Sequence, residues 1–275
     1  LIFDMRGFWA DERVDGNIWK KNSLIYKITK KIENLLLSKS NHIVTLTDKS
    51  KFILTKQFKI QQNKITVIPT CVDLKQFNIS KQNNKKNNKP FIVGYHGSIG
   101  TWYEFNKVLI FFKQFQKKIN NSKLYIISKV NKKIILEYLN QYNINYADVY
   151  IKSCDHDQIH NYIKYFDLNF FFIKKCFSKT ASCPTKFAES LSMGIPVVTG
   201  SEIGDVDKIF LKTNNQIGYI IRDFNTNEIN NSINHILKLK EDIKNKQICF
   251  DIAKKYFDLN IALSQYENLY KSKTK

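Results

Sequence analysis

The sequence predicts an α/β fold built on parallel sheets, and three observations support this prediction. Short runs rich in Ile, Val, Phe and Tyr recur along almost the whole chain, and amphipathic stretches of helical periodicity separate them. A chain of 275 residues with 43% apolar side chains can bury one large core or two modest ones. Even the richest apolar runs have only the length of strands, whereas a membrane-spanning helix needs about 20 apolar residues, so none is predicted.

The predicted strands are spaced so that helices fill most of the gaps between them. A stripe of apolar residues in the last segment predicts terminal helices as well. The expected strands, in chain order, are Ile2–Met5, His42–Leu46, Ile65–Ile68, Phe91–Tyr95, Lys123–Ile127, Val149–Ile151, Leu168–Ile173, Val197–Thr199 and Ile217–Ile220.

A polar, low-complexity stretch, SKQNNKKNNK at Ser80–Lys89, predicts a linker that divides the chain. The part before it holds three predicted strands, too few for a complete Rossmann-like domain, and the part after it holds six. Because Leu1 opens directly into an apolar run, we expect the chain to begin inside its first domain. The expected divisions are an incomplete Rossmann-like domain at 1–77, a linker at 78–89, a complete one at 90–249 and a helical tail at 250–275.

The formal net charge of +20 fits a polyanionic partner, either nucleic acid or an anionic lipid surface. It fits a general bias in residue usage equally well, because Lys, Asn and Ile are abundant while Arg, Gly and Pro are scarce. The lysines are dispersed and no DNA- or RNA-binding motif accompanies them, so we expect no nucleic acid partner.

The cysteines and histidines do not form a recognisable metal or disulfide pattern. The five cysteines are odd in number and include no C-x-x-C pair, which argues against both a disulfide framework and a zinc site and favours a reducing, cytoplasmic setting. His156 and His160 lie four residues apart at a predicted helix start without an acidic partner pattern, and we interpret them as solvated. No metal cofactor is therefore expected.

The most informative segment is SCPTKFAESLSMGIPVVTG, from Ser182 to Gly200. Pro184 suits the first position of a helix, Gly194 suits the left-handed residue that ends one, and Pro196 opens a buried strand. These three signals together predict a short helix that leads into a parallel strand.

On that helix Lys186 and Glu189 lie three residues apart and share one face near the N-terminus, beside the free backbone N–H groups of Thr185 and Lys186. A helix N-terminus attracts phosphate, and the lysine adds a point charge suited to a diphosphate. A carboxylate one helical turn beyond the lysine can accept hydrogen bonds from both hydroxyls of a ribose. This interpretation expects both side chains to point toward a ligand and not into the core; the alternative is an ordinary surface ion pair.

The same residues resemble the donor-site signature of glycosyltransferase family 4, with Pro-Thr-Lys ahead of Glu189 and a Met-Gly-Ile-Pro-Val-Val run after it. The resemblance implies a GT-B fold of two Rossmann-like domains, a nucleotide-sugar donor, retention of anomeric configuration and no bound metal. It makes Glu189 the ribose ligand and gives Lys186 the catalytic task of stabilising the departing diphosphate. Ala181 stands where the family's E-x7-E motif has its first glutamate, near the transferred sugar.

A second segment, IVGYHGSIGTWYEF at Ile92–Phe105, predicts a strand, a glycine-containing turn and a helix beginning near Tyr103. It resembles the first strand and loop of the GT-B donor domain, so we expect the turn to face the donor phosphates and sugar. Thr101 and Trp102 replace the Arg and Lys that often follow this turn in the family, which leaves Lys186 as the positive charge. The donor contacts expected from this segment are His96, Gly97, Ser98 and Gly100.

The N-terminal loop FDMRGFWADERVD is dense in charged and aromatic residues and resembles the family's loop on the acceptor side of the cleft. Arg6, Asp11 and Glu12 are the candidate contacts to acceptor or donor phosphate, with loop-stabilising ion pairs as the alternative. The segment KITVIPTCVDLKQF resembles the interdomain hinge, where we interpret Asp73 as a turn residue.

The stretch Asn17–Leu37 forms a basic amphipathic pattern, with seven apolar residues on one side and Lys20, Lys27, Lys30 and Lys31 on the other. We expect its apolar side to pack on the first sheet and its lysines to face an anionic membrane surface, so that the protein is cytoplasmic and peripheral on the inner face of the membrane.

The resemblance thus predicts transfer of a sugar from a nucleotide-sugar to a glycan or lipid-linked acceptor, with little transfer by this chain alone. A nucleotide-sugar-binding protein without transferase activity is the first alternative, favoured by Ala181. A polyanion-binding protein driven by charge is the second.

Overall fold

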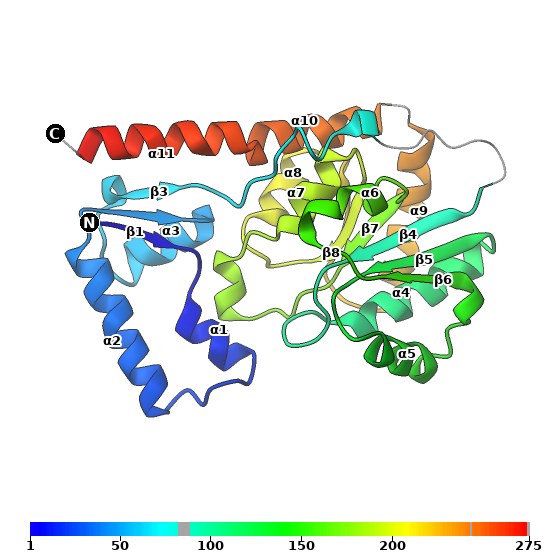
Figure 1. Ribbon diagram of the computed structural model, residues 1–275, viewed down its shortest axis with the longest axis horizontal. Coiled ribbons are helices and arrows are strands. Elements are labelled where there is room, and N and C mark those ends of the chain that lie inside the picture. Colours follow the sequence, from blue (N-terminus) through cyan, green and yellow to red (C-terminus); the bar gives the residue numbers. More distant parts are fainter. Residues whose placement is uncertain (82–88, 243, 274–275) are drawn as a thin grey trace.

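The computed structural model describes residues 1–81, 89–242 and 244–273 of the chain. Two parallel sheets lie at opposite ends of an elongated molecule, and the last two helices run along both of them (Figure 1). Most of the predicted linker, residues 82–88, lies outside the described residues.

The first sheet has the order β1-β2-β3, with β1 Ile2–Met5, β2 His42–Thr45 and β3 Ile65–Val67, all parallel. Its connections contain α1 Trp9–Asp15, α2 Leu24–Lys39 and α3 Asp48–Lys56. Its apolar strand residues pack with α2 and α3 in a small core of Met5, Phe8, Leu37, Ile43, Leu54, Ile65 and Ala181.

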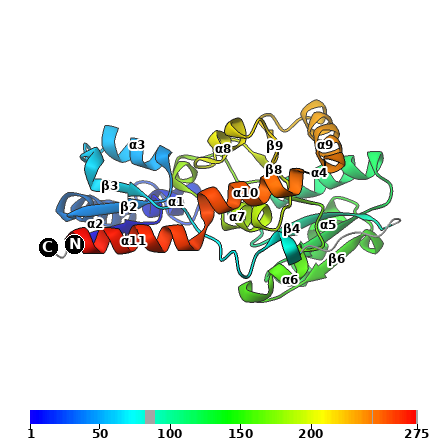
Figure 2. The same ribbon diagram turned by 90° about the horizontal axis from the view of Figure 1, so that it is seen from above.

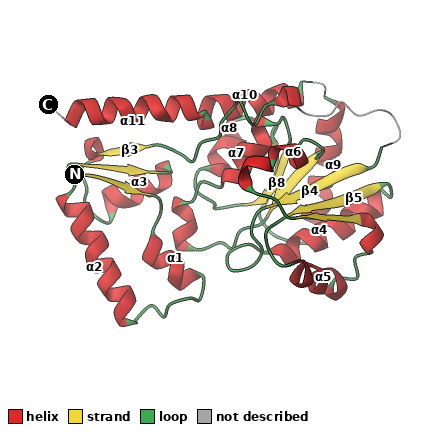
Figure 3. Ribbon diagram, in the orientation of Figure 1, coloured by secondary structure: helices red, strands yellow, loops and turns green. Residues whose placement is uncertain are grey.

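The second sheet has six parallel strands in the order β6-β5-β4-β7-β8-β9 (Figure 3). Helices α4, α5 and α9 lie on one face and α6, α7 and α8 on the other. The strands are β4 Phe91–His96, β5 Ser122–Ile127, β6 Val149–Lys152, β7 Leu168–Phe171, β8 Val197–Gly200 and β9 Gly218–Ile221. The helices are α4 Phe105–Lys118, α5 Lys132–Gln141, α6 His160–Ile163, α7 Thr185–Ser192, α8 Val206–Lys212 and α9 Thr226–Glu241.

The strand order of the second sheet fixes where a ligand can bind. From β4 the chain adds β5 and β6 on one side, and then returns to add β7, β8 and β9 on the other. In doubly wound sheets the ligand crevice lies at this reversal, outside the carboxyl ends of the strands. The turn after β4 and the helix after β7 are therefore the elements placed to hold a ligand.

Aromatic packing makes the second core dense. Phe111 and Phe115 of α4 contact one another, and Phe111 also packs on Phe170 of β7, with ring centroids 5.3 Å apart. Gly94 in β4 lies under the ring of Phe166, where an added Cβ would come within 1.9 Å of Cδ2. No residue other than glycine can occupy this position without displacing the ring.

The C-terminal helices α10 Asn245–Phe257 and α11 Leu259–Lys273 return the chain to the first sheet (Figure 2). At their junction Val72 N donates to the carbonyl of Phe257 at 2.8 Å, and Leu259 N donates to the carbonyl of Val72 at 3.2 Å. Further along α11, Ala262 and Leu269 pack with Val44 and Ile68. The helical tail thus joins the two sheets through backbone hydrogen bonds and an apolar contact.

The α/β fold with parallel sheets is confirmed, and the predicted strands are present among the described residues with ends shifted by at most two positions. The helix after the glycine turn begins at Phe105, two positions after the predicted start near Tyr103, which is held in bridges to Gly100 and Ile173. Pro184, expected at the first helical position, lies immediately before it.

The packing predicted for the amphipathic stretch was wrong. Helix α2 begins only at Leu24, because the Ser23 side chain caps it by accepting from Tyr26 N. Its inward residues are Glu33 and Leu37, whereas the apolar side faces solvent. The large apolar residues exposed on it are Leu24, Ile25, Ile28, Ile32 and Leu35.

Candidate functional site

Helix α7 presents the predicted donor residues at the carboxyl edge of the second sheet. Pro184 immediately precedes the first helical residue, Thr185, and Gly194 follows the helix with a left-handed φ of 71°. Every residue of α7 from Lys186 to Ser192 is buried. The local signals at Gly194 and Pro196 therefore predicted the helix end and the strand after it, but not the depth at which the helix lies.

Lys186 is a buried cation without a hydrogen-bond partner. Its side chain is 6% exposed, and no described group accepts a hydrogen bond from Nζ. The ammonium lies over the ring of Tyr103, 3.8 Å from the centroid, and 5.0 Å from the ring of Tyr95. Burial lowers the pKa of Lys186 to about 7, although the charge of Glu189 acts in the opposite direction.

An isolated buried ammonium costs free energy, which the face of an aromatic ring compensates only in part. An anion that entered beside Lys186 would supply the missing acceptors. The alternative interpretation, a surface ion pair with Glu189, does not hold among the described residues, because both side chains are buried and Lys186 Nζ has no hydrogen-bond partner.

Glu189 is 2% exposed, and histidines hold both of its carboxylate oxygens. Oε2 lies 2.9 Å from Nε2 of His96, and Oε1 lies 2.6 Å from Nε2 of His156. Burial acts to raise the pKa of Glu189, but the hydrogen bonds from His156 and His96 outweigh it and lower the pKa to about 2. His156 is exposed, as expected for a solvated residue, but its bond to the central carboxylate of the site was not expected.

The turn after β4 lies directly on Lys186. Gly97 has a φ of 111°, and a Cβ built there would lie 2.8 Å from Lys186 Nζ. Gly100 also has a positive φ, 85°, and the exposed Ser98 accepts a hydrogen bond from Tyr95 OH through its carbonyl. The structure therefore gathers His96, the glycine turn, Lys186 and Glu189 at the strand-order reversal, with Thr185 at the start of the same helix.

The three acceptor-side residues have separate roles in the structure. Asp11 accepts hydrogen bonds from Tyr26 OH at 2.8 Å and Lys30 Nζ at 2.9 Å, which is the loop-stabilising arrangement. Glu12 forms an ion pair with Lys179, which comes from the second half of the molecule. Arg6 is exposed and lines a cavity of about 480 Å³ that Glu12 also borders.

Helix α1 is the main contact of the first half with the loops around the site. Trp102 Nε1 donates to the carbonyl of Glu12 at 3.2 Å, and Ser178 N donates to Asp15 Oδ2 at 2.9 Å. Ala181 is 1% exposed within the core of the first sheet. A glutamate at that position would be buried among apolar side chains, which gives a physical reason for alanine there.

Sequence reasoning missed His156, Lys179 and Tyr103. The contacts of His156 with Glu189 and of Lys179 with Glu12 join positions 33 and 167 residues apart, so no local pattern marks them. Tyr103 lay within the segment assigned to the donor loop, and an aromatic residue next to the glycine turn was the available signal.

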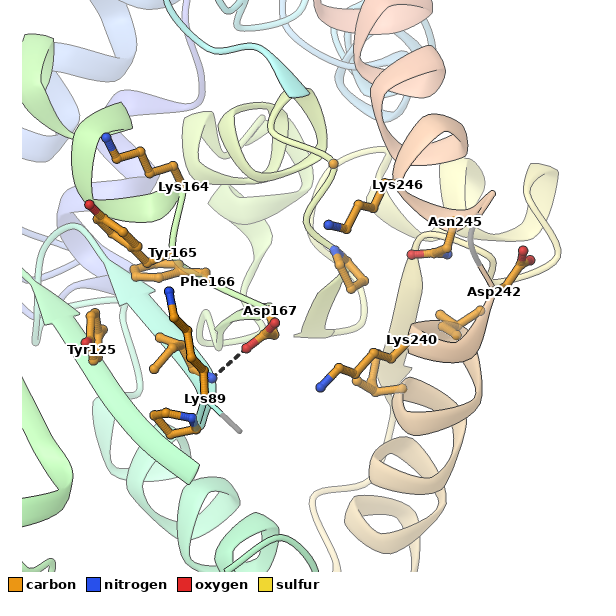
Figure 4. Close-up of a pocket in the computed structure, with 16 residues that line it drawn as sticks. Lys89, Tyr125, Lys164, Tyr165, Phe166, Asp167, Lys240, Asp242, Asn245 and Lys246 are labelled. Carbon is orange, nitrogen blue, oxygen red and sulfur yellow. Dashed lines mark hydrogen bonds between the residues drawn. The ribbon is translucent and has the colours of Figure 1, made fainter. Parts of the chain in front are cut away.

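A separate cavity of about 790 Å³ lies at the amino ends of β4 and β8, among four lysines and two aspartates (Figure 4). At its floor Asp167 accepts a hydrogen bond from Ile92 N at 2.6 Å. Although this cavity is large, it is at the wrong edge of a doubly wound sheet for the main ligand site. We therefore place the candidate site at Lys186 and Glu189.

Within the described ranges, no group of three or more His, Cys, Asp or Glu side chains is arranged to hold a metal ion, and the five cysteines are free. None of the helices in that part of the chain combines the length and the apolar character needed to cross a membrane.

Residues 76–249 match the family described as glycosyl transferases group 1. The chain belongs to this family. The match covers the second sheet with the turn after β4, α7 and the residues around Lys186 and Glu189. No curated protein matches the sequence.

Solved GT-B structures are similar to this chain over most of its length, and the chain has the GT-B fold. A glycosyltransferase from Rickettsia africae has a TM-score of 0.69 at 18% identity, over 89% of this chain and 66% of its own. A sucrose-phosphate synthase from Thermosynechococcus elongatus gives 0.72 at 14%, over 98% and 67%. Anabaena Alr3699/HepE, solved in complex with UDP and glucose, gives 0.69 at 14%, over 99% and 71%. The chain therefore spans about two thirds of these proteins.

Proposed function

We propose that this chain carries the donor site of a family 4, retaining glycosyltransferase, which moves a hexosyl group from a nucleoside diphosphate sugar to a glycan or lipid-linked acceptor. The observation that carries the proposal is the buried Lys186 ammonium, which has no hydrogen-bond partner at the N-terminal turn of a helix where a doubly wound sheet binds ligands. Similar structures solved with UDP support a nucleoside diphosphate as the anion.

In this proposal the diphosphate lies across the start of α7, beside the glycine turn at Gly97. Lys186 and the helix dipole stabilise the negative charge that develops as the bond between the anomeric carbon and the phosphate oxygen breaks. The acceptor oxygen attacks the same face of the sugar, and its proton passes to the leaving phosphate oxygen. Because Lys186 and the helix end supply the counter-charge, the proposal needs no metal.

Glu189 is the proposed ligand of the ribose. It lies one helical turn beyond Lys186, which matches the order of diphosphate and ribose in a nucleotide. Its pKa of about 2 keeps the carboxylate ionised at neutral pH, so it can accept hydrogen bonds from two hydroxyls. Titration calorimetry with UDP, GDP and ADP tests both assignments: equal binding by the parent and by Lys186→Met would overturn the role of Lys186, and equal binding by Glu189→Gln would overturn that of Glu189.

We also propose that residues 1–275 bind donor but transfer little sugar. The first sheet contributes three strands, and the acceptor-side charges of Asp11 and Glu12 are already engaged in ion pairs. A nucleotide-sugar-binding role without transfer is the second candidate. It is favoured by Ala181, which replaces the acidic residue of the family pattern and lies within the core of the first sheet. An assay of acceptor-dependent release of nucleoside diphosphate from a donor that binds tests the second candidate, because any such release would exclude a role in binding alone.

We also propose a cytoplasmic location on the membrane surface, and the exposed side of α2 supports the contact with the membrane. Leu24, Ile28 and Leu35 lie on this side, with exposed fractions of 74%, 48% and 56%, and Lys27 and Lys31 are also exposed. Lys30 does not belong to the basic set, because it is paired with Asp11 and Glu33 on the inner side of α2. An apolar stripe flanked by lysines fits an anionic leaflet.

A further inference from the structure

The carboxylate of Glu189 is held from two directions by side chains of unequal exposure. His96 ends β4, and its side chain is 2% exposed. His156 begins the short helical turn η4 His156–Gln158 between β6 and α6, and its side chain is 66% exposed. His96 therefore forms the floor of the Glu189 site, and His156 covers it from the solvent side.

His156 can leave Glu189 without disturbing the core. The only ring contact described for His156 is with Phe77, at a centroid distance of 6.1 Å and a tilt of 41°. Since most of the imidazole already contacts water, a rotation about its side-chain bonds exposes little additional apolar surface. A comparable movement of His96 would open the buried end of the second sheet.

A ribose that binds Glu189 needs the oxygen that His156 occupies. The 2.6 Å contact between His156 Nε2 and Oε1 leaves no room for a hydroxyl along the same direction. We propose that His156 is a latch on the nucleoside site: it occupies Oε1 of Glu189 in the empty protein and is displaced by the ribose hydroxyls of the incoming ligand. This inference rests on the proposed donor function and adds a residue that sets nucleoside affinity.

The charges around the latch make it sensitive to pH. The hydrogen bond to Glu189 is the main cause that raises the pKa of His156, burial acts against it, and Asp157 raises it further while Lys129 lowers it. Lys129 is itself paired with Asp155, at 2.5 Å. From the segment before the linker, Gln76 donates to the carbonyl of Asp157 and brings no charge.

A protonated His156 holds Glu189 by an ion pair, and a neutral one holds it by a weaker hydrogen bond. The latch is therefore strongest at pH values below the raised pKa of His156 and weakens as the pH rises through it. Nucleoside diphosphate affinity should rise over the same interval. Inorganic pyrophosphate, which has no ribose, should not show this rise through His156.

The experiment measures binding of UDP, GDP, ADP and pyrophosphate at pH 6 by titration calorimetry. The parent chain is compared with His156→Ala and with His160→Ala, a nearby histidine on α6 whose described contacts are with Gln76 and Phe77. We expect His156→Ala to bind the preferred nucleotide roughly tenfold more tightly than the parent, since a charge-assisted hydrogen bond no longer competes. Pyrophosphate affinity and the His160→Ala variant should match the parent.

A pH series separates the latch from the donor site itself. As the pH rises above 6.5, the ordinary value for histidine, the nucleotide affinity of the parent should rise relative to its pyrophosphate affinity, whereas His156→Ala should show a smaller rise. Unchanged or weaker nucleotide binding by His156→Ala overturns the latch while Lys186-dependent binding still stands. If no nucleotide binds the parent or His156→Ala, the proposed donor function fails, and the latch fails with it.

Discussion

Two lysines, one in each half of the molecule, show how differently the two regions use buried charge. Nζ of Lys30, on α2, lies 2.9 Å from Oδ2 of Asp11 and also forms an ion pair with Glu33. Burial acts to lower its pKa, but the bonds to Glu33 and Asp11 raise it. Lys186 of α7 is more deeply buried, has no hydrogen-bond partner, and has its pKa lowered to about 7 by that burial.

The difference indicates that the charge of Lys30 stabilises the fold, whereas the charge of Lys186 is available to bind a ligand. Removing a lysine that pairs with two carboxylates leaves both without its counter-charge, although Asp11 keeps the hydrogen bond from Tyr26, and for the buried Glu33 this is costly. Removing a lysine that satisfies nothing takes away a desolvation penalty and exposes no new charge. The ion pairs of Lys30 thus join α1 to α2 in the first half, whereas the second half keeps the charge of Lys186 at a cost to its stability.

The sharpest test of this comparison exchanges each lysine for methionine, which keeps the length and apolar stem of the side chain. Lys186→Met should weaken nucleoside diphosphate binding by about 1.5–3 kcal/mol, roughly 10- to 150-fold, and leave the fold as stable or more stable. Lys30→Met should retain binding and lose on the order of 1–3 kcal/mol of unfolding free energy. Calorimetry and urea unfolding measure the two effects, and the same outcome for both variants would break the comparison.

A matched pair of carboxylates extends the test. Glu189→Gln should weaken nucleotide binding by about tenfold, because a neutral amide accepts hydroxyl hydrogen bonds less strongly than a carboxylate. Glu33→Gln, in the first half, should leave nucleotide affinity unchanged. Pyrophosphate binding should be affected little in both variants, so a large loss of pyrophosphate binding in Glu189→Gln would place this residue at the phosphates and contradict its assignment to the ribose.

The contact between the halves is expected to have an intermediate effect. Lys179 is 8% exposed, pairs with Glu12 and lies 4.3 Å from the ring centroid of Trp102. Lys179→Met should therefore lower the unfolding free energy by about 1–2 kcal/mol. The control is Lys175→Met, whose pair with Glu202 is exposed and should contribute less than about 1 kcal/mol. Equal losses of unfolding free energy in urea would show that the buried pair contributes no more to stability than the exposed one.

The smallest effect concerns the membrane. Lys27→Gln with Lys31→Gln should reduce co-sedimentation with vesicles that contain anionic lipid, since each lysine near such a surface contributes about 1 kcal/mol. Lys132→Gln with Lys133→Gln, on α5 of the second sheet, should not reduce it. High salt should release the parent. If the parent does not bind the anionic vesicles, or if both double variants bind them equally, α2 does not face the membrane.

The sequence predicted most of what depends on neighbouring residues. Strand ends were correct to within two positions because apolar runs and the turn at Gly194 are local signals. The spacing of Lys186 and Glu189 placed both on one helix. Their burial was not predictable, because it depends on Tyr103, His96 and the whole second sheet folding around α7.

The exposed apolar side of α2 is a second case in which burial could not be predicted from the sequence. A helical pattern identifies an apolar stripe, but which element covers the stripe depends on tertiary packing, and here the inward side carries Glu33 and Leu37. The long-range pair of Lys179 and Glu12 likewise exists only once η5 Phe177–Ala181 reaches α1.

The central claim is that the ammonium of Lys186 is the counter-charge of a diphosphate, and proton uptake on binding tests it most directly. With a pKa of about 7 in the empty protein, Lys186 is mostly neutral at pH 8, and a bound diphosphate would favour its charged form. Calorimetric titrations at pH 8 in buffers of different ionisation enthalpy should show the parent taking up protons as it binds nucleoside diphosphate, and Lys186→Met taking up fewer. A parent chain that binds nucleotide at this pH without taking up a proton would contradict the account.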